Sequence, residues 1–514
     1  MKNMKPQSPH TTVNMNRPTS NLAAFMAAMI GLFVAGWPAT GASVYWDPSH
    51  NHTGGPGTWD TTTANWATTA GGNTFVAWNN ANNDLARISM KDTETLASDI
   101  TAIGIEAYNL TGYGNTVITS PVNGNGDYLY TLTIGSSGIN YSGGWWGWTI
   151  RANVNLTANQ SWAASGNGDG YLYGKLSGSS TLRVASTPLH FLGDGSGFTG
   201  PITHDLGTIY YGHANALGST GTAGNWLWEG VNGAIGIVAE GGARTIPNPI
   251  TTQSGYGISG ITLGGTNDLT FTGPVTLSRG GTWDFNVTNT GNTRFSNTIA
   301  STNTNVQKSG GGVLIFAGNN SYTGTTTVNA GTLLVNGTTS GQGNYTVASG
   351  GTLGGTGTIG IGSNTVTIQS GGKLAPGASI GILTVTGNVD FQNNAVYLWD
   401  ADGNVAAPNN ADLLALNGNI TFEGNTSLKL ANWNGDPTGD TFTLFTFTGS
   451  LIGTPTWSID TSGTGWTGGA VNVGSHAITL TGLVPEPASL SLLVLGGALC
   501  LRRRRGCSRD RFVA

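Results

Sequence analysis

The sequence repeats itself between residues 308 and 391, and this repeat restricts the possible fold more than any other feature. A Gly-x-Leu element recurs at Gly331, Gly351 and Gly372, a step of 20 to 21 residues. Polar and apolar residues alternate on both sides of each glycine turn, which is typical of short β-strands. One unit of this length cannot bury its own apolar side chains, whereas stacked units share a core. The repeat therefore predicts an all-β fold, a β-solenoid in which each unit forms one coil.

The composition shows how such a chain must be stabilised. Glycine supplies 83 of the 514 residues and only 9% are charged, whereas ordinary domains carry about 25% charged residues. Both cysteines, Cys500 and Cys507, lie near the C-terminus, so residues 43–485 contain none. Disulfides and thiolate chemistry are therefore excluded from this body. Its stability must come from hydrogen-bonded ladders and stacked side chains.

The charge of the body limits its partners. Residues 43–485 carry 23 acidic and 11 basic side chains, a net charge near −12. Phosphate backbones are bound by basic surfaces, so we expect no nucleic-acid partner. The charge is compatible with a neutral or cation-bridged polysaccharide.

The N-terminus has the organisation of a secretory signal peptide. Residues 1–21 are polar, 22–36 are apolar, and small residues follow a tryptophan and a proline. This order predicts cleavage between Ala42 and Ser43. A retained N-terminal anchor is the alternative.

The C-terminus has a second segment with an unusual order. The motif Val484–Pro487 precedes an apolar run, 488–501, and then four arginines, 502–505. Arginine clusters stay on the cytoplasmic side, which places the body outside the cytoplasm. The apolar run has 14 residues where a stable span needs about 20, so we expect a temporary anchor.

This arrangement resembles the PEP-CTERM sorting signal of Gram-negative bacteria, which an exosortase recognises at the inner membrane. The tail 506–514 departs from the usual pattern, and an ordinary membrane anchor is the alternative. The resemblance assigns the sorting signal to Val484, Pro485, Glu486, Pro487, Arg502, Arg503, Arg504 and Arg505.

A second resemblance concerns the repeat. Lys308 to Leu333 contains a Gly-rich turn, a Leu/Phe strand, a Tyr-Thr-Gly turn, Thr-x-Val and Gly-Thr-Leu. It looks like an autotransporter-associated β-strand repeat, with the best copy at 308–337 and a diverged copy at 190–217. The resemblance implies a right-handed parallel β-solenoid (β-helix) of passenger type, and it implies no catalytic activity. Separately, the alternating strands after about residue 395 predict a C-terminal β cap or a small sandwich.

These features divide the chain into six expected regions. They are a signal peptide (1–42), a Trp-rich N-terminal cap with the first coils (43–180), the solenoid (181–395), a C-terminal β region (396–483), the sorting signal with a hydrophobic helix (484–505) and a tail (506–514).

A carbohydrate-active enzyme is the main alternative, because many β-solenoids are polysaccharide lyases or glycoside hydrolases. Such chemistry needs paired carboxylates, or a base with a calcium site. The stretch 285–389 contains no Asp or Glu. The upstream candidates match no motif and sit in turns where aspartate is ordinary, so we predict that the chain is not an enzyme. These candidates are His190, Asp194, His204, Asp205 and His213.

Two further patterns suggest metal ions but are incomplete. His50 and His52 form a lone His-x-His pair without a third ligand. The stretches 123–127 and 167–169 resemble calcium loops but lack the full ligand set, which favours turns. We therefore predict neither a metal nor another cofactor.

Tryptophans offer a possible sugar-binding surface. Strand alternation places Trp146 and Trp148 on one face, near Gly-rich turns. Large aromatic side chains also dominate burial energy, so packing of a cap or coil edge is the favoured interpretation and sugar binding is the alternative.

The sequence therefore predicts an exported structural or adhesive protein of the cell surface or extracellular matrix of a Gram-negative bacterium. Its expected partners are an exosortase-type enzyme, extracellular polysaccharide and, transiently through 488–501, the inner membrane. A polysaccharide-binding module, lyase or glycoside hydrolase of β-helix type is the alternative.

Overall fold

The computed structural model describes residues 41–486 except for short gaps. The gaps are residues 53, 90–91, 109–114, 142–146, 165–167, 186–187, 220, 230–234, 254–257, 279, 403, 405–410 and 436–437. The predicted signal peptide up to residue 40, and the sorting segment from Pro487 onwards, lie outside the described residues.

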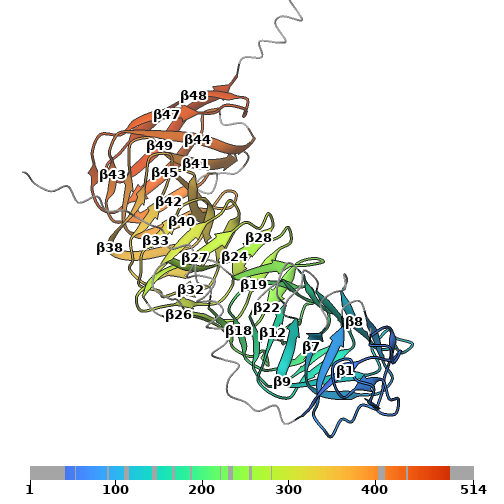
Figure 1. Ribbon diagram of the computed structural model, residues 1–514. Coiled ribbons are helices and arrows are strands. Elements are labelled where there is room, and N and C mark those ends of the chain that lie inside the picture. Colours follow the sequence, from blue (N-terminus) through green and yellow to red (C-terminus); the bar gives the residue numbers. More distant parts are fainter. Residues whose placement is uncertain are drawn as a thin grey trace, which may run out of the picture.

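The described chain is an elongated stack of coils that follows the sequence from one end to the other (Figure 1). In the repeat region each coil contributes three short strands. Strand β33 (Thr326–Val328) is followed by β34 (Gly331–Val335) and β35 (Thr338–Thr339), and β36 (Tyr345–Val347) then stacks on β33 in parallel. The repeat unit is therefore one coil, and the strands form the parallel ladders of a β-solenoid.

Three ladders run along the stack, and the first has one strand from most coils. It consists of β1 (Ser43–Trp46), β5 (Leu85–Ser89), β7 (Ile100–Tyr108), β9 (Thr131–Tyr141), β12 (Gln160–Ala164), β15 (Leu182–Val184), β18 (Ile202–His204), β20 (Trp226–Trp228), β23 (Ile250–Gln253), β26 (Val275–Ser278), β29 (Ile299–Ala300), the adjacent β32 (Asn319–Asn320), β35, the first parts of β38 (Thr358–Ile368) and β40 (Ile382–Phe391), β42 (Leu413–Asn417) and β45 (Thr441–Phe447).

The second ladder starts near the N-terminal end of the stack. It consists of β2 (Gly57–Trp59), β6 (Thr93–Leu96), β8 (Thr116–Thr119), β10 (Trp148–Arg151), β13 (Gly170–Leu172), β16 (Leu189–Phe191), β19 (Gly207–Tyr211), β21 (Ile235–Ala239), β24 (Ile258–Gly264), β27 (Gly281–Val287), β30 (Thr304–Ser309), β33, β36, the last parts of β38 and β40, β43 (Ile420–Phe422) and β46 (Leu451–Ile452).

The third ladder is present as two series. The first is β11 (Asn153–Leu156), β14 (Leu176–Gly178) and β17 (Gly197–Phe198). The second is β22 (Arg244–Ile246), β25 (Leu269–Phe271), β28 (Asn292–Phe295), β31 (Val313–Phe316), β34, β37 (Gly351–Gly355), β39 (Lys373–Pro376), β41 (Ala395–Asp402), β44 (Asn425–Asn434) and β47 (Thr456–Asp460).

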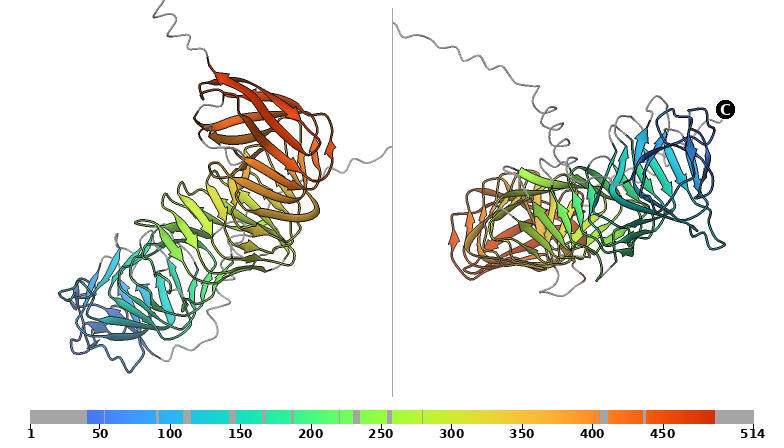
Figure 2. Two further views of the ribbon diagram at one scale, coloured as in Figure 1. Left: turned by 180° about the vertical axis from the view of Figure 1, so that it is seen from behind. Right: turned by 60° about the horizontal axis from the view of Figure 1, so that its bottom comes forward.

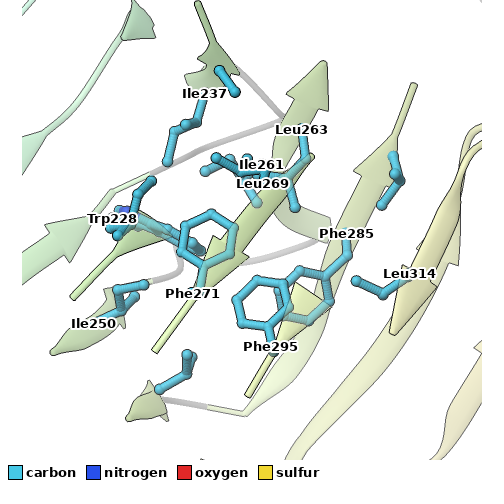
Figure 3. Close-up of a cluster of buried hydrophobic side chains, with 14 of the residues drawn as sticks. Trp228, Ile237, Ile250, Ile261, Leu263, Leu269, Phe271, Phe285, Phe295 and Leu314 are labelled. Atoms are coloured by element: carbon cyan, nitrogen blue, oxygen red, sulfur yellow. The ribbon is translucent and has the colours of Figure 1, made fainter. Parts of the chain in front are cut away.

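The core lies between the ladders and consists of columns of inward-facing side chains. Along the third ladder, Leu314, Leu333, Leu353 and Leu374 lie opposite one another in successive coils, and all are fully buried. Figure 3 shows the part of the core from Trp228 to Leu314, where aromatic and branched side chains fill the same space. Because every coil places apolar side chains at equivalent inward positions, the stacked coils bury one continuous core.

Glycine is required where the chain turns from the second ladder to the third. Gly331 has a φ of 64°, and a Cβ there would lie 2.5 Å from the carbonyl oxygens of Gly310 and Gly312. A left-handed backbone with so close an approach admits no side chain without strain, which explains the Gly-Thr-Leu element of the repeat.

Antiparallel strand pairs occur at the two ends of the described stack. Strands β3 (Trp66–Ala67) and β4 (Phe75–Val76) fold back beside β1, and β48 (Trp466–Val473) and β49 (Ala477–Pro485) form a hairpin beside β45. Figure 2 shows this hairpin at the C-terminal end of the solenoid. Turning the last strands antiparallel covers edges that would otherwise pair with other chains.

Two features of the sequence look different in the structure. The parallel ladders continue across residues 395 and 396, so the change in composition there is not a break in the solenoid. The diverged copy at 190–217 is one face out of phase with the best copy, because Gly207–Ile209 lies in the second ladder and Gly331–Leu333 in the third. Similar short motifs therefore occupy different faces.

Candidate functional site

The upstream candidates for catalysis lie on different faces of the coil. His190 is on β16 of the second ladder and His204 is on β18 of the first. His204 is fully buried, its Nε2 lies 2.9 Å from the Gly207 oxygen, and its ring stacks on Trp226. Burial lowers the pKa of His204 to about 4, so this side chain is a neutral core histidine.

His190 belongs to a stacked aromatic column on the second ladder. Its ring centroid lies 4.2 Å from that of Tyr171 and 4.1 Å from that of Tyr210, with nearly parallel planes. The Nδ1 atom is 2.8 Å from Glu240, and Nε2 is 3.6 Å from Asp169. Residues in successive parallel strands lie about 4.8 Å apart, so the solenoid itself stacks these rings. The column joins one histidine to two carboxylates at a partly exposed surface.

A second group of charges surrounds Asp205. Arg183 Nε donates a hydrogen bond of 2.5 Å to Asp205 Oδ2. Glu229 lies beside Asp205 in the next coil, and burial followed by the Asp205 charge raises the pKa of Glu229. Two neighbouring carboxyl groups, one with a raised pKa, are compatible with acid-base chemistry. The placement of His204 in the core, however, keeps it away from this group.

Asp194 and His213 form a turn rather than a reactive pair. Asp194 Oδ1 accepts a hydrogen bond from Ser196 N at 2.9 Å, and Asp194 Oδ2 accepts one from Ser196 Oγ at 3.0 Å. His213 Nδ1 lies 3.8 Å from Asp194. This geometry is the turn chemistry that aspartate commonly supplies.

The tryptophans predicted to bind sugar do not form an exposed surface in the described residues. Trp148 is 2% exposed and packs edge-on against Trp162 at 5.7 Å. Trp148 therefore packs inside the coil, in agreement with the favoured interpretation, and the sugar-binding alternative does not apply to it, since a ring inside the coil cannot stack on a sugar. Trp146 lies outside the described residues.

The histidines near the N-terminal end point to different partners. His50 stacks on Phe75 at 3.9 Å and its Nε2 is 2.8 Å from the Ala64 oxygen, whereas His52 N donates to Asp47 Oδ2. Within the described residues no group of three or more His, Cys, Asp or Glu side chains is arranged to hold a metal ion.

The first of the two calcium-like stretches is a turn. Asn123 Oδ1 accepts hydrogen bonds from Asn125 N at 2.9 Å and Asp127 N at 3.0 Å. Asp127 also pairs with Lys175 at 3.0 Å. Of the second stretch, residue 167 lies outside the described residues, and Asp169 belongs to the His190 column.

Sequence reasoning missed a buried charge within the repeat. Lys308 is fully buried, and its Nζ donates hydrogen bonds to the oxygens of Ser309 (2.9 Å), Gly310 (2.8 Å) and Ala330 (3.0 Å). Burial lowers the pKa of Lys308 to about 8, while Asp284 acts in the opposite direction. The lysine thus satisfies turn carbonyls of two successive coils, which is a structural role. The sequence did contain a signal for this burial, because strand alternation places Lys308, a charged residue, at an inward position.

Two buried carboxyl groups were also missed. Glu94 is fully buried, and neither of its carboxyl oxygens has a hydrogen-bond partner in other described residues. Burial, then the Asp92 charge, raises its pKa well above the ordinary value. Asp412 accepts hydrogen bonds from Gly381 N and Asp400 N, and burial raises its pKa to about 8. Periodicity alone did not distinguish these acids from turn residues.

The structure describes the beginning of the predicted sorting signal. Within the part of the chain that the structure describes, Leu483 is the last residue with a buried side chain, and Val484 and Pro485 continue strand β49 with exposed side chains. Glu486 follows the strand and its N–H donates to the Gly465 oxygen at 2.9 Å. The motif therefore starts where the core ends. Pro487 and the residues up to Arg505 lie outside the described residues.

The predicted cleavage site for the signal peptide borders the first strand. Ser43 opens β1, and Ala42 is exposed, although its backbone N–H donates to Asp84 Oδ1 at 2.8 Å. Helices long and apolar enough to cross a membrane are absent from the part of the chain that the structure describes.

Comparison with known proteins supports the repeat. Residues 306–335 match the passenger-associated-transport-repeat family, which confirms the repeat predicted at 308–337. An 87-residue stretch, 17% of the chain, is 45% identical to 2% of the adhesin BmaC autotransporter of Brucella suis biovar 1 (strain 1330). A 150-residue stretch, 28% of the chain, is 31% identical to 14% of an extracellular serine protease of Serratia marcescens. The chain therefore spans only a small part of the length of these relatives.

Proposed function

We propose that this chain is an exported structural or adhesive protein, a right-handed β-solenoid that projects from the cell surface or into the extracellular matrix of a Gram-negative bacterium. One observation carries the proposal. The passenger-type repeat at 306–335 lies within parallel ladders that extend from β5 to β47. Similarity to part of an adhesin autotransporter supports a surface location and an adhesive role.

Retention at the surface is proposed to depend on the C-terminal segment. Residues 484–505 would act as a PEP-CTERM signal, with transient insertion of 488–501 in the inner membrane and processing by an exosortase-type enzyme. The start of the motif directly after Leu483 supports this role, because a processing site must lie outside the folded core.

Cell fractionation combined with mass spectrometry of both termini tests this proposal. The mature protein is expected in the surface or matrix fraction, beginning at Ser43 and lacking Arg502–Ala514. A strain without the sorting enzyme should keep the C-terminal segment. Intact Arg502–Ala514 on surface protein from both strains would overturn the sorting proposal, and a cytoplasmic body would overturn export.

A second candidate function is polysaccharide binding beside the His190 column. Tyr171 and Tyr210 cover the two faces of His190. Thr149 and Val238 occupy the next positions of the ladder beside these two tyrosines, so the column does not offer a platform for a sugar ring. The partly exposed carboxylates of Asp169 and Glu240, however, can accept hydrogen bonds from sugar hydroxyls. The variant Asp169→Asn/Glu240→Gln is expected to lower affinity for isolated matrix polysaccharide about tenfold. Asp460→Asn on β47 is the control, and unchanged affinity of the double variant contradicts this candidate.

A further inference from the structure

The sorting motif begins inside a β-hairpin rather than after it. In the antiparallel register of β48 and β49, Val484 lies opposite Thr467 and Pro485 lies opposite Trp466. The Glu486 N–H donates to the Gly465 oxygen. Three consecutive positions of the motif are therefore held against the preceding strand.

The register also accommodates the proline. Hydrogen-bonded and non-hydrogen-bonded pairs alternate along an antiparallel ladder. Because Glu486 and Gly465 form a hydrogen-bonded contact, the adjacent pair Pro485–Trp466 occupies a non-hydrogen-bonded position. Proline, which lacks an N–H, fits a strand at such a position. The first proline of the motif therefore does not break the hairpin.

The end of the hairpin has fewer neighbours than the rest. Strand β45 pairs with β49 only as far as Thr481, so residues 482–485 have β48 as their single neighbouring strand among the described residues. Leu483 holds this end from inside the core, whereas Val484 is 45% exposed. On β48 the main attachment is Trp466, whose ring packs edge-on against Trp433 at 5.6 Å. This short end can open locally without unfolding of the coils.

From this geometry we infer that the β48–β49 hairpin regulates processing of the sorting segment. A cleaving enzyme binds its substrate as an extended strand through main-chain hydrogen bonds. Residues 484–486 must first separate from Thr467, Trp466 and Gly465, and the separation stops at Leu483. The stability of the hairpin end thus sets the rate at which the exported chain is processed. This inference rests on the proposed sorting function.

Variants of β48 test the inference without altering the motif. Trp466→Ala removes the aromatic attachment and is expected to speed processing about fivefold in a pulse-chase experiment. Thr467→Ile keeps the branched Cβ but places a larger, fully apolar side chain opposite Val484, and it should slow processing about twofold. The control is Asn472→Ala, farther along β48, which removes a contact of 3.0 Å with Thr481 Oγ1 and should leave the rate unchanged. Equal rates for all three variants and the wild type overturn the inference.

A reversible crosslink distinguishes the hairpin from the proposed function itself. The crosslink uses the variant Thr467→Cys/Val484→Cys in a chain in which both native cysteines are replaced, Cys500→Ser and Cys507→Ser. Residues 467 and 484 lie directly opposite each other, and the Cα separation of such a pair suits a disulfide. The oxidised chain should resist processing, and reductant should restore processing of the same chain. Equal processing in both redox states overturns the hairpin inference while wild-type processing still supports sorting. Absence of processing in the wild type overturns the sorting function and, with it, this inference.

Discussion

The N-terminal coils and the repeat region use different side chains to fill similar coils. Near the N-terminus, Trp46, Trp59, Trp66 and Trp78 pack with ring centroids 4.8 to 5.0 Å apart. In the repeat region, columns of leucine and valine recur coil after coil. The first region depends on particular neighbours and the second on repetition. The tryptophans of the N-terminal coils therefore depend on one another, and we expect the loss of one of them to disturb the whole cluster. A repeat coil, by contrast, can be exchanged for its neighbour.

Deletion of one coil is expected to show the largest difference between the regions. Removing residues 331–350 places Leu353 opposite Leu314, where Leu333 lies now. This variant should fold with a melting temperature lower by about 5 °C. Removing 85–104 eliminates Asp92, whose Oδ1 accepts a hydrogen bond from Gly55 N, and should prevent folding of the N-terminal end.

Secretion yield, circular dichroism and tryptophan fluorescence measure this difference. Equal loss of folding in both deletions would show that the repeat coils are not interchangeable, contrary to the comparison.

A single substitution in the tryptophan cluster should have the next largest effect. Trp59 is fully buried, with ring centroids 4.9 Å from Trp66 and 5.0 Å from Trp78. Trp59→Ala leaves a large cavity and is expected to lower the free energy of unfolding by about 4 kcal/mol. Denaturant titration followed by fluorescence measures the change, with Val76→Ala on exposed β4 as the control. A loss no greater than that of the control would contradict the role of the cluster.

The buried lysine of the repeat gives a smaller expected effect. Lys308→Met keeps the side-chain length but leaves three turn carbonyls without their donor, which should cost about 2 kcal/mol. Lys373→Met on β39 is the matched control. Because Lys373 faces outward, this variant should show little change in the free energy of unfolding. Equal losses in the two variants would remove the proposed structural role of Lys308.

The smallest expected effect is a stabilisation that depends on pH. Burial raises the pKa of Glu94 above its unfolded value, which is about 4.3. Its contribution to stability is therefore complete below that unfolded pKa and decreases as pH rises towards the folded pKa. Glu94→Gln should leave the free energy of unfolding nearly unchanged at pH 4.5 and raise it by about 1 kcal/mol at pH 8.

Chemical denaturation at the two pH values checks this expectation. Glu106→Gln, which removes a partly exposed ion pair with Arg87, should show no comparable gain at pH 8. A destabilised Glu94→Gln at pH 8 would indicate that the carboxylate has a partner.

Much of this fold followed from local patterns. Alternation identified strands, glycine identified turns such as Gly331, and the repeat spacing gave one coil for each unit. Among the described residues, Leu483 is the last one with a buried side chain. Candidate sites were harder to predict, because alternation separates the two faces of one strand but does not say which face looks inward. Trp148 turned out to face the core, and His190 and His204 lie on different ladders.

By itself, the sequence determined a stacked β-repeat, because glycine turns at a constant spacing repeat the same inward positions in every coil. Only the tertiary structure decided which residues meet between coils. It placed His190 between Tyr171 and Tyr210, brought the Lys308 ammonium to three carbonyls, and paired Val484 and Pro485 with β48. Apart from the two carbonyls next to Lys308, these contacts join residues 17 to 22 positions apart. Their register therefore depends on how each turn directs the next strand.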